Sequence, residues 1–172
     1  YQATSGSGLA GVDELAKQVA EADGAGPELA HNGDAVTFSA PEKFARTIAF
    51  NALPMCGSVV DDGSFETDEE QKLRNETRKI LDGDIAVHAT CVRVPVFVGH
   101  GEAVNVEFAS AIDENTARDV LRDAPGVMVV DQRDNDGYIT PVECAGDDAV
   151  YVSRIRKDPT VKHGLSLWVV SD

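Results

Sequence analysis

The pattern of hydrophobic and polar positions is dominated by one long β-type stretch, from Ile85 to Phe108. Its first half, Val87 to Phe97, is mostly β-branched, which predicts a strand. In its second half, from Val104 to Phe108, apolar and polar residues alternate. This period of two is typical of a half-buried strand. The stretch therefore predicts two successive strands near the middle of the chain.

Several residues inside this stretch do not fit a plain strand. Pro95 cannot donate a ladder hydrogen bond, so it marks a sheet edge or a bulge. Gly99 and Gly101, on either side of His100, permit a tight reversal. In a straight strand, Arg93 and His100 would lie roughly 23 Å apart, at about 3.3 Å per residue. Both side chains can serve one small ligand only if the chain bends between them.

The N-terminal segment predicts a helix that begins at Leu9 and ends before Gly24, with Ser5 or Ser7 as its N-cap. Its apolar stripe at helical spacing consists of Leu9, Val12, Ala16 and Val19. The glycines Gly6, Gly8 and Gly11 spell G-x-G-x-x-G, but a dinucleotide-binding motif must follow a strand, and only five residues precede it. We therefore interpret these glycines as a Ser/Gly-rich helix start, which can still face a phosphate or amide of a ligand.

Thr67 opens the best-defined helix, because Thr67 and Glu70 form a capping box. Its apolar residues, which we expect to face the core, are Leu73, Ile80 and Leu81. This places the carboxylates of Glu69 and Glu76 on or near the buried side, where an unpaired charge is costly. A third helix is expected from Asp113, its N-cap, to about Leu121.

Short β-rich runs predict further strands at residues 35–38, 47–50, 127–130, 149–152 and 165–170. Strands outnumber helices and often follow one another directly. This order favours an α+β fold with a mixed or antiparallel sheet and helices packed on one face. At 172 residues the chain is long enough for one good core, and residues 1–172 are predicted to form one domain.

One loop imitates a calcium-binding loop. Between Gln132 and Glu143, the residues in register with that motif are Asp134, Asp136, Gly137 and Glu143. However, the first position is Gln132, Pro141 lies inside, and a predicted strand precedes the loop where an EF-hand has a helix. These departures favour a solvated, turn-rich loop over a calcium site.

Composition narrows the class of protein. A hydrophobic content of 42% and a charged content of 26% are those of an ordinary globular protein. The net charge of −15 would repel phosphate backbones, so nucleic acid is not expected as a partner. Three cysteines without CxxC spacing argue against a disulfide framework and a structural zinc site, and they fit a reducing cytoplasm. No apolar run of about 18 residues and no leader peptide are visible, so no membrane association is expected.

Four polar residues violate the patterning and are candidates for chemistry: Glu69, Lys72, Arg93 and His100. Arg93 offers a bidentate fork for a carboxylate, and His100 is the natural general acid or base near neutral pH. Together the four suit a small zwitterionic or dicarboxylic ligand. The missing part is a nucleophile. A Cys91–His100 dyad is one alternative, although buried free cysteines in strands usually serve packing.

Six segments, read together, resemble bacterial aspartate-semialdehyde dehydrogenases: Tyr1–Gly8, Glu69–Leu81, Ala89–Val96, Gly99–Val104, Arg154–Arg156 and Leu165–Asp172. The match runs over essentially the whole chain, in order and at the family's spacings. It implies the C-terminal catalytic and dimerisation domain, of the glyceraldehyde-3-phosphate-dehydrogenase-like α+β type, and hence a homodimer. That family reduces aspartyl phosphate to aspartate semialdehyde with NADPH, on the route to lysine, threonine and methionine.

The resemblance also implies roles for individual residues. Arg93 would bind the substrate carboxylate, Glu69 the substrate amino group, and Lys72 the phosphate that adds or leaves. His100 would be the acid/base, and Gln2 would help to hold the thioester intermediate. The residues that would touch the nicotinamide end of NADP are Ser5 and Gly6.

The resemblance also implies that this chain differs from the family in two ways. The family's nucleophilic cysteine, in an Asn-Cys motif, and its NADP-binding domain lie upstream of Tyr1, and the family continues past Asp172 with a helix at the cofactor site. Cys91 is therefore not the expected nucleophile, and the chain alone is expected to be inactive. The alternative is a non-enzymatic dimerisation or small-ligand-binding module.

Overall fold

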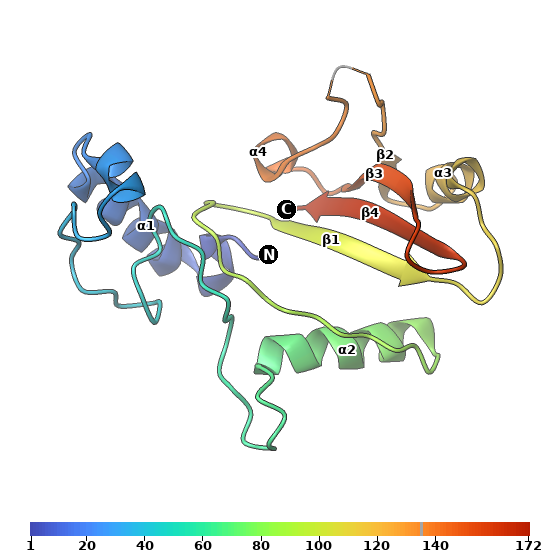
Figure 1. Ribbon diagram of the computed structural model, residues 1–172, viewed down its shortest axis with the longest axis horizontal. Helices are drawn as coiled ribbons and strands as arrows, with labels where there is room; N and C mark the ends of the chain where they lie inside the picture. The colour runs from blue at the N-terminus through green and yellow to red at the C-terminus, as the bar shows by residue number, and fades with distance from the viewer. Residues whose placement is uncertain (135) are drawn as a thin grey trace. The chain divides into compact units, whose positions relative to one another are not determined.

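The computed structural model describes residues 1–134 and 136–172, and the chain divides into two compact units, Tyr1–Phe97 and Val98–Asp172 (Figure 1). The first unit contains two short 3₁₀ helices, Thr4–Ser7 and Gly26–Ala30, and the helices α1 (Leu9–Glu21) and α2 (Asp68–Leu81). The second contains β1 (His100–Glu107), α3 (Glu114–Arg122), β2 (Val127–Val129), α4 (Pro141–Cys144), β3 (Val150–Asp158) and β4 (Gly164–Ser171). Asn135, inside the calcium-like stretch, lies outside the described residues.

The second unit is built on one four-stranded sheet in the order β1-β4-β3-β2 (Figure 1). β1 pairs antiparallel with β4 and β4 antiparallel with β3, whereas β2 pairs parallel with β3. This confirms the predicted mixed sheet of an α+β fold. The strands predicted at 127–130, 149–152 and 165–170 are present, and the strand predicted from Val104 already begins at His100. Asp113 caps α3 as predicted, since its Oδ1 accepts from the Thr116 N–H at 2.8 Å.

A bulge in β3 determines which side chains reach the core of this unit. The pairing of β3 with β4 shifts register between Ser153 and Arg156, and Arg154 has a left-handed backbone with φ of 56°. Side chains of a regular strand alternate between faces, so one inserted residue brings both Val152 and Ile155 to the same face. There they are buried against Ala117 of α3 together with residues of the other strands, including Leu165, Leu167, Val169 and Val127.

The opposite face of this sheet contacts the segment that precedes α4. Trp168 of β4 donates from Nε1 to the Ile139 carbonyl at 2.9 Å, and the Ile139 N–H donates to Ser153 Oγ at 3.3 Å. α4 then begins with a capping box, in which Glu143 Oε2 accepts from the Thr140 N–H at 2.6 Å. The carboxylate that would close a calcium loop is thus engaged in starting a short helix.

In the first unit, α1 forms where predicted, but its cap and its buried face differ from the prediction. The N-cap is Gly8, which makes no side-chain cap, because the serines before it belong to a 3₁₀ helix. Leu9 and Val19 of the predicted apolar stripe are 75% and 44% exposed. The buried face consists instead of Gly11, Glu14, Leu15 and Gln18.

Two polar side chains explain why this face of α1 is buried. Gln18, fully buried, accepts from the N–H groups of Ile48 and Ala49 at 2.9 and 3.1 Å and donates to Glu14 at 3.2 Å. The other oxygen of Glu14 accepts from two further N–H groups, those of Glu42 and Lys43. Residues 35–38 and 47–50 do not form strands, so this prediction was wrong. At Ile48 and Ala49, the side chain of Gln18 accepts the backbone hydrogen bonds that a neighbouring strand would otherwise accept.

Helix α2 confirms one prediction and corrects another. The capping box is present, with Glu70 bonded back to Thr67. Leu73 is half-buried, but Ile80 and Leu81 are 76% and 60% exposed, so the prediction that these two face the core was wrong. The apolar stripe of α2 is narrow, because only three of its residues are apolar. The residues near the C-terminal end of the helix are therefore exposed. No helix among the described residues is both long and apolar enough to cross a membrane.

The stretch from Val87 to Phe97 is extended but is not the regular strand that was predicted. Its ladder-type pairing is limited to isolated bridges of Arg93 with Gln2 and Leu53. Just beyond, around Pro95, the Val96 N–H turns back to the Val94 carbonyl at 2.8 Å. Pro95 thus coincides with the interruption of the extended segment, and the one well-paired residue is the candidate ligand Arg93.

Candidate functional site

The backbone of Arg93 is held on both sides by other segments of the first unit. On one side, Arg93 and Leu53 exchange both backbone hydrogen bonds, at 2.8 and 2.9 Å. On the other, the Gln2 N–H donates to Val92 at 2.8 Å and the Gln2 carbonyl accepts from Val94 at 3.1 Å. Two segments that are distant in sequence therefore converge on this arginine and fix its position.

The Arg93 side chain is buried, with 7% of the residue exposed. Its Nη1 donates to the Ala3 carbonyl at 2.7 Å, and its guanidinium carbon lies 6.0 Å from the centre of the Phe44 ring. Gly6 admits this group, because a Cβ at that position would lie 2.5 Å from Nη1. A guanidinium has five N–H donors in a planar fork, so donors remain for a bound carboxylate.

Gln2 also reaches α2, which carries the two other candidate ligands. Its Nε2 donates to Glu69 Oε1 at 2.8 Å, and the same oxygen lies 3.4 Å from Lys72 Nζ. Glu69 and Lys72 are three residues apart and therefore lie on one helix face. Gln2 Oε1 lies 3.6 Å from where a Gly6 Cβ would be. Gln2, Gly6, Glu69 and Lys72 thus form one connected group of contacts that includes Arg93.

The remaining two sequence candidates differ in what surrounds them. Ser5 contributes backbone bonds, since its N–H donates to the Phe97 carbonyl at 3.0 Å and its carbonyl accepts from Gly8 at 2.7 Å. These bonds fix the turn in which Gly6 is exposed. His100 is the first residue of β1, in the second unit, and is exposed.

None of the three cysteines has the properties of a nucleophile. Cys56, Cys91 and Cys144 are all buried and free. Burial, followed by the neighbouring Cys56, raises the pKa of Cys91 to about 11. Burial likewise raises the pKa of Cys56 and of Cys144. Because the thiolate is the reactive form, these shifts argue against the Cys91–His100 dyad.

Glu70 is the residue that sequence reasoning assigned only to helix capping. One oxygen of its carboxylate accepts from the Thr67 N–H at 2.9 Å, as a capping box requires. The other accepts from the Cys91 N–H at 2.9 Å, two residues before Arg93. These bonds, led by that from Thr67, hold the pKa of Glu70 below its ordinary value. The capping pattern in the sequence could identify the first bond, but the second joins distant segments.

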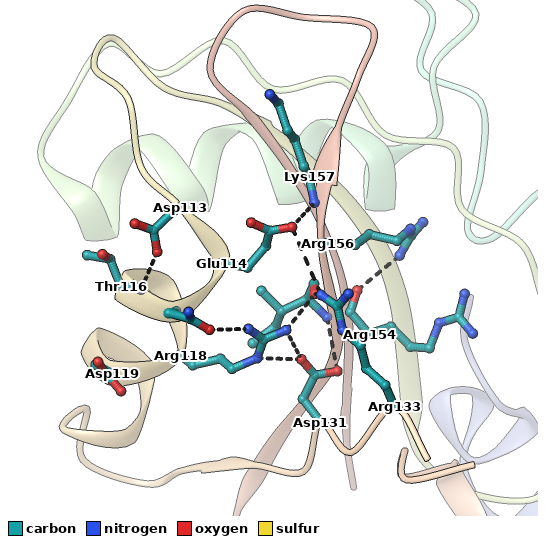
Figure 2. A network of polar contacts seen from close by, with 12 residues as sticks. Asp113, Glu114, Thr116, Arg118, Asp119, Asp131, Arg133, Arg154, Arg156 and Lys157 are labelled. Carbon is teal, nitrogen blue, oxygen red and sulfur yellow. Dashed lines mark hydrogen bonds and ion pairs between the residues drawn. The ribbon is translucent and has the colours of Figure 1, made fainter. Parts of the chain in front are cut away.

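A second polar network lies in the second unit (Figure 2). Arg118 of α3 binds Asp131 at 2.7 Å and donates to the Ile155 carbonyl at 3.0 Å, while Asp131 accepts from the Ile155 N–H at 3.3 Å. Both charged side chains are largely buried, 12% and 6% exposed. The network fastens α3 to the β3 bulge. It lines a shallow hollow with Glu114, Asn115 and Arg133.

Among residues 1–134 and 136–172, no three His, Cys, Asp or Glu side chains are grouped so that they could hold a metal ion.

The mixed sheet, covered on one face by α3, defines an α+β domain. The chain belongs to the semialdehyde dehydrogenase dimerisation domain family, whose model matches residues 1–172. This confirms the family resemblance that the sequence motifs indicated.

Curated relatives and solved structures agree with this assignment. Aspartate-semialdehyde dehydrogenase of Streptomyces akiyoshiensis is 52% identical over 173 residues, which cover 100% of this chain and 49% of the relative. The crystal structure of aspartate semialdehyde dehydrogenase II of Vibrio cholerae, complexed with ASA, matches with a TM-score of 0.85 and 40% identity, over 100% of this chain and 47% of that one. The crystal structure of the Candida albicans aspartate semialdehyde dehydrogenase with NADP matches with a TM-score of 0.57 and 26% identity, over 73% of this chain and 40% of that one. The chain spans about half the length of the curated relatives it matches.

Proposed function

We propose that this chain is the substrate-binding and dimerisation part of an NADP-dependent aspartate-semialdehyde dehydrogenase. The observation that carries the proposal is the buried Arg93, held by two other segments and connected through Gln2 to Glu69 and Lys72. The guanidinium of Arg93, the carboxylate of Glu69 and the ammonium group of Lys72 match, in this order, the carboxylate, ammonium and phosphate groups of the proposed reactants. The three unpaired cysteines fit a reducing compartment, and the cytoplasm is the proposed location.

The substrate ligands differ in what their chemistry suits. Arg93 would bind the substrate carboxylate in a bidentate pair, which a planar guanidinium forms better than an ammonium group. Glu69 would accept from the substrate ammonium, and the 3.4 Å contact with Lys72 keeps a cation beside it. Lys72, with its side chain 53% exposed, would hold the mobile phosphate as a flexible point charge.

The remaining roles concern proton transfer and the cofactor. His100 would be the acid/base, because an imidazole titrates near neutral pH. The Gln2 amide would help to hold the acyl intermediate. Ser5 and Gly6 fit the nicotinamide end of NADP, since Gly6 is exposed and has no side chain to keep a flat ring away. When bound, NADP supplies the hydride acceptor or donor.

Phosphate titration of the chain tests the arrangement of the anion ligands. Phosphate is expected to bind weakly despite the net charge of −15, and Arg93→Ala and Lys72→Ala are each expected to weaken binding about tenfold, the effect of losing a charged hydrogen-bond partner. The measurement is chemical-shift titration at fixed ionic strength. Lys79→Ala, which removes a cation from the last turn of the same helix, is the matched control and should bind like the wild type. Equal binding by all four proteins would contradict the proposal.

A homodimer is the proposed assembly. The family description names a dimerisation domain. Apolar side chains of the second unit remain exposed, including Met128 of β2 at 53% and Val150 of β3 at 36%, and a two-fold partner would cover surfaces of this kind. We expect a monodisperse dimer in light scattering at micromolar concentration. A stable monomer under those conditions would show that residues 1–172 do not suffice for assembly.

A further inference from the structure

We propose that Glu70 is a positioning residue, whose carboxylate fixes the first turn of α2, with Glu69 and Lys72, against the segment that carries Arg93. This inference rests on the proposed function, because it concerns how the same substrate ligands are held at their mutual distance. Glu70 itself is not assigned any contact with substrate.

The two carboxylate oxygens of Glu70 accept hydrogen bonds from two backbone N–H groups in different segments, an arrangement that we call a clip. Oε2 of Glu70 accepts from the Thr67 N–H at 2.9 Å, and Oε1 accepts from the Cys91 N–H at 2.9 Å. The first bond lies within the start of α2, whereas the second crosses to a segment 21 residues away in the sequence. A single rigid carboxylate therefore sets the distance between these two backbone sites.

The two ends of the clip lie next to the proposed ligands. Glu69 is the neighbour of Glu70, and Lys72 follows two residues later on the same helical turn. At the other end, Cys91 lies two residues before Arg93, and both are buried, at 5% and 7% exposure. A displacement of the Cys91 backbone relative to α2 would therefore change the spacing between the guanidinium fork and the carboxylate–ammonium pair.

The electrostatics favour a permanent clip. A carboxylate that accepts from backbone N–H groups makes charge-assisted bonds, which are shorter and stronger than neutral ones. The Thr67 and Cys91 N–H bonds both lower the pKa of Glu70, so the carboxylate stays ionised across the neutral range. The direct side-chain contact between Gln2 and Glu69, at 2.8 Å, then depends on a spacing that Glu70 keeps constant.

The competing explanation is that Glu70 only caps α2. Thr67 forms the other half of the same capping box, since its Oγ1 accepts from the Glu70 N–H at 3.3 Å, but it makes no bond to Cys91 through that oxygen. Thr67→Ala is therefore the matched control for loss of capping. Glu70→Gln keeps one carbonyl oxygen, so it can accept at only one end of the clip, and it loses the negative charge. Glu70→Gln therefore breaks the clip with little change of shape, whereas Thr67→Ala weakens the cap and leaves both oxygens of Glu70 in place.

The test uses a full-length enzyme that contains this chain, assayed with aspartate semialdehyde, phosphate and NADP. Glu70→Ala is expected to lower kcat/KM by about 10- to 100-fold, mainly through the KM values of semialdehyde and phosphate, because misplacement of positioned groups costs rate in this range. Glu70→Gln, which loses one end of the clip, should also raise these KM values. Thr67→Ala, a capping defect that leaves both oxygens of Glu70 in place, should remain within about threefold of the wild type.

A second readout follows the clip directly. Hydrogen exchange of the Cys91 amide, measured by NMR on residues 1–172, should be protected in the wild type and in Thr67→Ala, and accelerated in Glu70→Ala. If Glu70→Ala and Thr67→Ala change KM and exchange equally, Glu70 is only a cap and the inference is wrong. If Glu70→Ala does not fold, a Glu70→Gln variant with the KM values of the wild type would equally overturn it.

These outcomes are distinguishable from failure of the proposed function. Arg93→Ala in the same full-length enzyme reports on the function itself. If Arg93→Ala leaves the KM of semialdehyde unchanged, the proposed function fails whatever Glu70 does. If Arg93→Ala raises that KM while Glu70→Ala does not, only the positioning role is rejected.

Discussion

Replacement of His100 by alanine in a full-length enzyme that contains this chain is expected to lower kcat by about two orders of magnitude or more. A positioned general acid or base typically contributes about 10²–10⁴ in rate. Because His100 is proposed to move a proton rather than to hold the substrate, the KM of semialdehyde should change little. Arg93→Ala should show the reverse pattern, with its main effect on KM. Steady-state kinetics in the direction of NADP reduction separates the two.

Two controls define this experiment. His163→Ala removes a histidine just before β4 that has no proposed role, and it should behave like the wild type. The isolated chain of residues 1–172 should reduce no NADP, because burial raises the pKa of all three of its thiols and no thiolate nucleophile is at hand. Turnover by the isolated chain, or a His100→Ala variant with wild-type kcat, would refute the assignment and return attention to Cys91.

Replacement of Asp131 by alanine is expected to lower the free energy of unfolding by about 3–5 kcal/mol, the usual cost of removing one partner of a buried ion pair. Arg118, whose side chain is only 12% exposed beside Asp131, would lose its carboxylate partner, and the Ile155 N–H would lose an acceptor at 3.3 Å (Figure 2). Urea denaturation of residues 1–172 measures the change as a shift in midpoint at constant slope.

Helix α3 provides a matched control for this prediction. Arg122 pairs with Asp119 at 3.0 Å, but these side chains are 57% and 74% exposed. An exposed pair of this kind contributes little, because water and salt screen it. Asp119→Ala should therefore leave the midpoint almost unchanged. If both substitutions shift the midpoint equally, the stability of the second unit does not depend on the burial of the Arg118–Asp131 pair.

Local signals in the sequence were sufficient for much of the second unit. The Asp113 cap, the three later strands and the alternation in β1 are short-range features, and each appears in the structure. The β3 bulge was not predictable, since nothing in Ser153–Arg156 requires a left-handed backbone at an arginine. The bulge allows Val152 and Ile155 to pack in the same cluster as Ala117 of α3.

The difference at α1 has an identifiable cause. Helical periodicity of apolar residues predicts an apolar buried face, yet the buried face of α1 contains Glu14 and Gln18. A buried polar side chain is favourable only when its partners are in place, and those partners lie some 30 residues away, at Ile48 and Ala49. The candidate site was recognised through the same kind of exception, since Arg93 stood where a strand would carry an apolar residue. The hydrogen bond between Glu70 and Cys91, in contrast, corresponds to no unusual residue in the sequence pattern.

The hydrogen bonds to side chains of α1 also divide the segment after α1 into parts that differ in their tolerance of substitutions and insertions. Ser39, Glu42, Lys43, Ile48 and Ala49 are each anchored through their backbone to a side chain of α1. Such anchoring is independent of the anchored residue's own side chain, so Ser39, Glu42 and Lys43 can accept substitutions other than proline, but the segment cannot accept a change of length. Ile48 and Ala49 are in addition buried in the core. Around Gly33 the contacts are local, such as the Asp34 N–H to Asn32 at 3.0 Å, and the space beside Gly33 is open. A peptide tag or reporter group belongs at that turn, where an added stretch of chain would disturb none of the anchors.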